Sequence, residues 1–211
     1  MHWHVLEGGA FADQAISGFR APTKIERNGK TYTLAWQSPQ KAELSVFEYT
    51  SNGEPVEQWT SLITIAHVKG KLPSPDAWIQ ASNAGMKVMR PEPYHQFFKK
   101  DGHAFAMMIS PRVKGIPSYE SNVQKSFHLS ECGGLVIHQY AEKVAEQPEL
   151  KQGSPEQQAF YKRLVDGNIQ IAEYAVADSL IAYERNWKIQ VSSNPIENMT
   201  RWLSRMWYWP L

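Results

Sequence analysis

The sequence predicts an α+β fold: a single antiparallel β-sheet of about six to eight strands with helices packed on it. Strand-like segments rich in Val, Ile, Thr, Phe and Trp follow one another between residues 23 and 140, separated by short turn signals. Helical patterns then fill the C-terminal third. A parallel doubly wound sheet would alternate strands with helices along the whole chain, so this order favours an antiparallel sheet.

Length and composition agree with one globular unit. The 211 residues are enough for one domain, and 42% apolar residues with a net charge of +1 differ from the composition of a disordered chain. Residues 1–20 are Gly-rich and weakly patterned, so we expect them to form an N-terminal arm. We expect residues 21–211 to form a single α+β domain.

Turn residues mark the first strands. Segments 23–26 and 31–37 flank an Asn-Gly dipeptide, and both of these residues tolerate the positive φ of a type I′ hairpin. Segments 43–49 and 59–68 have strand composition and enclose a second Asn-Gly pair. Apolar residues occupy both faces of segment 59–68, which predicts a central strand covered on both sides.

A helix is predicted after these strands. Ser74 is a good N-cap, Pro75 suits the first helical position, and Asp76 favours the positive end of the helix dipole. Pro91 ends the helix at or before Arg90.

Two more hairpins and a helical region complete the chain. Segments 94–100 and 103–110 enclose an Asp-Gly turn, and segments 123–129 and 135–140 enclose a Gly-rich one. Residues 154–157 form a capping box with proline at the first helical position, and helical patterns continue from there towards the C-terminus.

Composition also narrows the classes of partner. A net charge of +1 and a pI near 7.8 give no global field for a polyanion, so no nucleic-acid partner is expected. The sequence contains no run of 18 apolar residues, so it predicts no transmembrane helix. The N-terminus lacks the basic and apolar regions of a signal peptide, so we expect a cytoplasmic protein or the mature part of an exported one.

One candidate site is a nucleophilic cysteine. Cys132 lies near His128 and His138 in the sequence, a combination that suits a hydrolase or transferase, or a metal site. A three-residue loop would place the two histidines opposite each other, whereas a two- or four-residue loop would place them on opposite faces. The alternative is an incidental cysteine in a hairpin turn, because activated cysteines usually lie at helix N-termini or beside cations.

A second candidate is a metal site at the N-terminus, where His2 and His4 flank one residue. Two imidazoles near the start of a chain can converge on copper or nickel. The alternative is a frayed arm without a ligand.

The most unusual local composition is the aromatic C-terminus, with Trp202, Trp207, Tyr208 and Trp209. These amphipathic rings either dock on the sheet or form an interface with a partner. We therefore expect a non-enzymatic binding or protein-interaction module that presents an aromatic or sheet-edge surface to a protein or small-molecule ligand. The alternatives are the Cys132 enzyme and a metal-binding protein using the N-terminal histidines, and no pattern identifies a cofactor.

Overall fold

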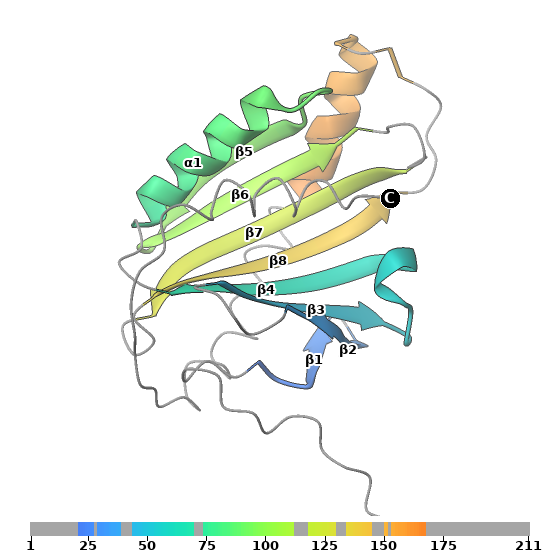
Figure 1. The fold of residues 1–211 in the computed structure, drawn as a ribbon. Helices are drawn as coiled ribbons and strands as arrows, with labels where there is room; N and C mark the ends of the chain where they lie inside the picture. Colours follow the sequence, from blue (N-terminus) through green and yellow to red (C-terminus); the bar gives the residue numbers. More distant parts are fainter. Residues whose placement is uncertain are drawn as a thin grey trace, which may run out of the picture.

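The computed structural model describes residues 21–27, 29–38, 44–69, 74–111, 118–129, 134–144, 150–151 and 153–167 (Figure 1). Its elements are, in chain order, β1 (Lys24–Arg27), β2 (Lys30–Gln37), β3 (Leu44–Ser51), the 3-10 turn η1 (Val56–Gln58), β4 (Ser61–Lys69), α1 (Pro75–Val88), β5 (Tyr94–Lys100), β6 (His103–Ser110), β7 (Tyr119–Leu129), β8 (Gly134–Val144) and a helix over residues 155–167.

The strands form one antiparallel sheet of eight strands in the order β1-β2-β3-β4-β8-β7-β6-β5. Two four-stranded meanders, β1–β4 and β5–β8, are joined where β4 pairs with β8. This arrangement confirms the predicted single antiparallel sheet. β4 lies at the centre of the sheet, and all but its last residue are buried, as the apolar residues on both of its faces predict.

Short turns fix the register of the hairpins. Gly29 has a φ of 71° in the β1–β2 turn, where Arg27 pairs with Lys30 across a two-residue loop. Asp101 and Gly102 have φ values of 51° and 76° and join β5 to β6 in the same way. Both are the positive-φ geometry that closes a two-residue hairpin.

The two helices pack on opposite faces of the sheet (Figure 1). Trp78 of α1 packs with Ala104 and Ala106 of β6, whereas Phe160 of the 155–167 helix packs with Met107 on the same strand. Successive strand residues point to opposite faces, so this alternation separates the helices. We call the side that carries α1 the α1 face and the other side the opposite face.

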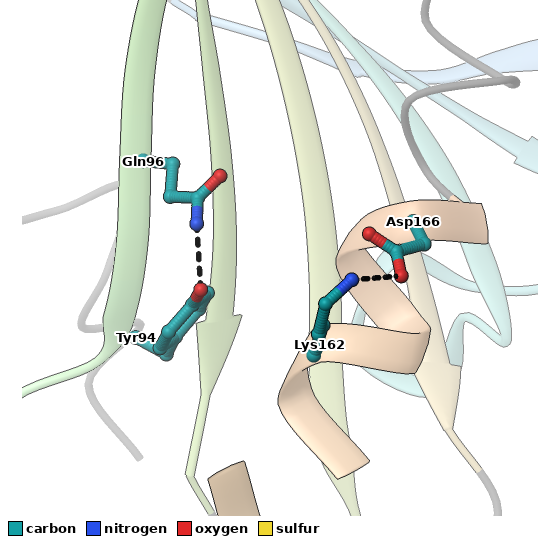
Figure 2. A network of polar contacts seen from close by, with 4 residues as sticks. All are labelled: Tyr94, Gln96, Lys162 and Asp166. Carbon is teal, nitrogen blue, oxygen red and sulfur yellow. Dashed lines mark hydrogen bonds and ion pairs between the residues drawn. The ribbon is translucent and has the colours of Figure 1, made fainter. Parts of the chain in front are cut away.

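The 155–167 helix lies against the β5–β7 end of the opposite face. Figure 2 shows its Lys162–Asp166 ion pair near Tyr94 and Gln96 of β5, which are joined by a hydrogen bond. In the core, Tyr161 packs on Tyr94 with 5.5 Å between the ring centroids. Aromatic contacts therefore attach the helix to the sheet, whereas the Lys162–Asp166 ion pair lies within the helix.

The opposite face curls strongly at the other end of the sheet. The guanidinium carbon of Arg27 on β1 lies 3.5 Å from the ring centroid of Tyr140 on β8, although β2, β3 and β4 separate these strands in the sheet order. β1 therefore folds over the opposite face. The cluster beneath it includes Tyr32, Phe47 and Ile65.

The predicted helical C-terminal third has support only over residues 155–167. The backbone N–H of Gln157 donates to Ser154 Oγ over 3.2 Å, and Gln157 Oε1 accepts the Gly153 N–H over 2.8 Å, so the helix begins at the predicted capping box. A capping box fixes where a helix begins. The length of the helix depends on tertiary packing, which the residues of the capping box do not determine. Residues 168–211 and the expected arm, residues 1–20, lie outside the described residues.

Among the described helices, none has the length and apolar character to cross a membrane.

Candidate functional site

Most of the side chains predicted for a site lie outside the described residues, and their roles stay predictions. They are Cys132, the N-terminal residues His2 and His4, and the aromatic residues Trp202, Trp207, Tyr208 and Trp209.

The β7–β8 hairpin places His128 and His138 on opposite faces of the sheet. Leu129 pairs with Gly134, so the loop contains four residues, and His138 lies opposite Lys125 on β7. His128 is exposed and His138 is buried. The register is the four-residue alternative, in which these two imidazoles cannot act on the same group.

The α1 face carries a row of side chains that runs straight across five strands. Each member lies directly opposite the next in the strand register. The row, called here the polar row, comprises Trp36 on β2, Glu48 on β3, Thr64 on β4, Gln139 on β8 and Gln124 on β7.

One end of the polar row is a buried amide network. Gln124 Nε2 donates to Gln139 Oε1, and Gln139 Nε2 donates to Asn122 Oδ1 over 3.2 Å. All three side chains are buried, and Asn122 Nδ2 has no hydrogen-bond partner. These bonds fix the orientation of the amides, and one N–H donor group is left unused.

The other end of the polar row is more open. Trp36 is 37% exposed and follows an irregularity in the β2–β3 register, between Leu34 and Trp36. Beside it, burial raises the pKa of the Glu48 carboxyl to about 7, and the charge of Glu57 raises it further in the same direction. Glu48 Oε2 is buried without a hydrogen-bond partner. The carboxyl is therefore partly protonated at neutral pH and can both donate and accept.

The opposite face carries a cluster of a different kind. Arg27 lies over the ring of Tyr140, whose hydroxyl donates to the Glu142 carboxylate. Tyr32 meets the same ring edge-on, with 6.4 Å between centroids, and its hydroxyl bonds to Ser61 Oγ over 3.0 Å. The cationic cluster, as we call it, comprises Arg27, Lys125, His138, Tyr140 and Tyr49.

Several polar atoms of the cationic cluster are buried without hydrogen bonds. They are all three guanidinium nitrogens of Arg27, both ring nitrogens of His138 and the hydroxyl of Tyr49. Burial lowers the pKa of Arg27 and raises that of Tyr49. Burial also lowers the pKa of His138 to about 3, and the charges of Arg27 and Lys125 lower it further. At neutral pH His138 is therefore uncharged, next to two cations.

Neither site has the chemistry of a metal centre. Over the described ranges, no group of three or more His, Cys, Asp or Glu side chains converges as metal ligands would. The polar row supplies amide, hydroxyl and carboxyl groups, whereas the cationic cluster supplies N–H donors and positive charge. Both arrangements are suited to recognising a ligand by hydrogen bonds.

Sequence reasoning did not select most of these residues. Arg27 and Glu48 are charged residues in strands, where the usual expectation is a solvated side chain. The members of the polar row lie on five different strands and meet only through the pairings of those strands in the sheet. The available signal was the presence of polar residues, Thr64 among them, in the strand predicted to be central.

Both clusters lie within the part of the chain that resembles other proteins. An uncharacterized protein of Haemophilus influenzae is 28% identical over 142 residues, which cover 61% of this chain and 69% of the relative. No solved structure matches the chain. The model of one uncharacterised protein family matches residues 19–175, well over half of the chain, and the chain therefore belongs to that family.

Proposed function

We propose that the protein is a non-enzymatic binding module that takes a neutral, hydroxyl-rich small molecule, such as a sugar, at the open end of the polar row. The observation that supports this most directly is the register that sets Trp36 beside Glu48 and Thr64 on one face. Trp36 offers an aromatic surface in a different part of the chain from the C-terminal aromatics that the sequence analysis named.

The chemistry of the row favours hydroxyl groups. A hydroxyl both donates and accepts hydrogen bonds, so it is best matched by groups that do the same. Glu48, with its pKa near 7, supplies both functions. The exposed ring of Trp36 adds an apolar surface for the C–H face of a sugar ring.

Charged ligands fit the row less well. An anion would be repelled by the ionised fraction of Glu48 and by Glu57 nearby. A cation would have to compete with the proton that the Glu48 carboxyl holds up to about pH 7. A neutral ligand avoids both difficulties.

The buried end of the row is separate from its open end. Gln139 is held by hydrogen bonds to Gln124 and Asn122. Thr64 lies between Gln139 and Glu48 in the strand register. Trp36 and Glu48 are therefore the contact residues, at the open end of the row.

Saturation-transfer NMR on the full chain tests this proposal, with glucose, galactose, mannose, N-acetylglucosamine, maltose and cellobiose as probes. We expect transfer to the ring protons of at least one sugar and its loss in Trp36→Ala. Glu48→Leu removes both hydrogen-bonding functions and should weaken the signal. Val88→Ala should leave it unchanged, because Val88 is an exposed side chain on α1. Equal signals in wild type and Trp36→Ala, or none from any probe, would overturn the proposal.

The Cys132 enzyme, the N-terminal metal site and a C-terminal protein interface remain separate hypotheses, which no contact among the described residues favours.

A further inference from the structure

We propose that the cationic cluster on the opposite face is a second ligand site, which binds a small oxyanion, a phosphate or a carboxylate, between Arg27 and His138. It is independent of the polar row, because the sheet separates the two faces. The argument rests on what the cluster buries and what it leaves without a bond.

Arg27 is the first part of the argument. Its side chain is buried, with 7% exposure, and a guanidinium stays charged at any ordinary pH. Its contact with Tyr140 uses only the flat face of the group. The five N–H donors lie in the plane of the guanidinium and are left for another partner. None of the three nitrogens has a hydrogen bond within the protein.

The nearby acid does not fill this role. Glu142 acts on Arg27 through its charge, but it accepts a hydrogen bond from the Tyr140 hydroxyl and none from the guanidinium. A buried cation without a hydrogen-bonded counter-charge is strongly unfavourable. The simplest way to satisfy it is an anion that offers two oxygens to the guanidinium edge.

His138 supplies a second donor on the same face. It lies two residues from Tyr140 on β8, and it is buried with both ring nitrogens unbonded. Lys125 stands directly opposite it on β7. Arg27 lies over Tyr140, two residues from His138 along β8, whereas Lys125 Nζ lies 5.7 Å from the centroid of the Phe127 ring. An oxyanion between Arg27 and His138 would meet the guanidinium and an imidazole N–H donor.

The size of the group follows from its surroundings. Tyr140, Tyr32 and Phe47 belong to one buried cluster, and the Tyr49 hydroxyl lies on the same face without a partner. Apolar rings surround the charged groups, so the site fits a compact oxyanion better than a chain of phosphates. Phosphate and carboxylate share this chemistry, and the experiment distinguishes them.

Thermal unfolding and calorimetric titration of the full chain test the proposal, with inorganic phosphate and acetate as probes and chloride at equal ionic strength as the reference. We expect one of the two probes to raise the melting temperature of the wild type above the chloride value. Arg27→Met keeps the volume of the stem but removes the donors, and should weaken binding by at least about tenfold. Lys24→Gln removes an exposed cation on the same strand and should retain the effect.

Two results would overturn the proposal. One is the absence of any shift above chloride in the wild type with either probe. The other is an equal shift in wild type and Arg27→Met, which would mean that the anion acts on the general surface charge. If Arg27→Met fails to fold, the ¹⁵N signal of the Arg27 side chain in the wild type decides the question, because an anion bound at the guanidinium must shift it. Binding of neutral sugars at the polar row is expected to survive Arg27→Met, so the two proposals fail independently.

Discussion

The two faces of the sheet bury polar side chains in contrasting ways. On the α1 face the buried amides bond to one another, and burial raises the pKa of two carboxyls, Glu48 to about 7 and Glu120 in the same direction. On the opposite face a guanidinium and a neutral imidazole are buried without hydrogen bonds. The amides of the α1 face find most of their hydrogen-bond partners within the protein. The guanidinium and the imidazole of the opposite face would need hydrogen-bond partners that the fold does not supply. This difference predicts opposite responses to mutation and to pH.

The largest loss of stability is expected from a mutation in the apolar part of the α1 face, where α1 packs on the sheet. Trp78→Ala empties a buried site between α1 and the sheet, where the indole also meets Phe97 edge-on. We expect the free energy of unfolding to fall by about 3–5 kcal/mol. Urea denaturation followed by circular dichroism measures it. Val88→Ala on the same helix, with a side chain 76% exposed, should change it by less than about 0.5 kcal/mol. A loss as small for Trp78→Ala would mean that α1 does not hold this face.

The second prediction concerns the amide network. Gln139→Leu keeps a similar volume but leaves Gln124 and Asn122 without their shared partner. Each buried polar group left unbonded costs about 1–3 kcal/mol, so we expect a loss of about 2–4 kcal/mol in urea denaturation. Gln37→Leu, at an exposed position of β2, is the matched control. If both variants lost the same amount, the network would add nothing to stability.

The elements of the sheet were largely predictable, because their signals are local. The Asp-Gly turn gave both strands of the β5–β6 hairpin with their bounds, and the capping box gave the start of the helix at residue 155. Such signals depend on residues a few positions apart, and the physics of a turn or a cap is complete within them.

The sites were not predictable, because they depend on long-range pairing. Glu48 reaches Gln139 only through β4, and the pairing of β4 with β8 joins segments that lie far apart in the sequence. The β7–β8 loop shows that one residue decides which side chains meet: the four-residue loop separates His128 from His138, and a three-residue loop would have paired them. The burial of Arg27 requires the curl of the whole sheet, and a strand of four residues contains no signal for it.

The third prediction uses pH on the opposite face. The pKa of His138 is about 3 in the folded protein, below the 6.5 of an unperturbed histidine, so the unfolded chain binds more protons between these values. The free energy of unfolding should therefore fall as the pH is lowered from about 6.5 towards 3, and His138→Gln should remove about 2–4 kcal/mol of that fall. The difference between the two curves isolates His138 from His67, whose pKa burial also lowers, to about 4. Parallel curves would contradict the burial of a neutral imidazole.

The last prediction has the opposite sign and belongs to the α1 face. The pKa of Glu48 is raised from 4.5 to about 7, so the folded protein binds more protons than the unfolded chain between these values. Its contribution to stability is complete below pH 4.5 and is lost as the pH rises through 7. Glu48→Gln mimics the protonated form, so above pH 7 it should be more stable than the wild type by about 1–3 kcal/mol.

Urea denaturation of wild type and Glu48→Gln from pH 5 to pH 8 measures this difference, with Glu26→Gln, at an exposed position of β1, as the matched control. Sugar binding at the polar row would change the result in an informative way. A ligand that bonds to the protonated carboxyl should raise the pKa further and bind more tightly at pH 6 than at pH 8, whereas one that prefers the carboxylate should do the reverse. The direction of that pH dependence therefore identifies whether Glu48 donates to the ligand or accepts from it.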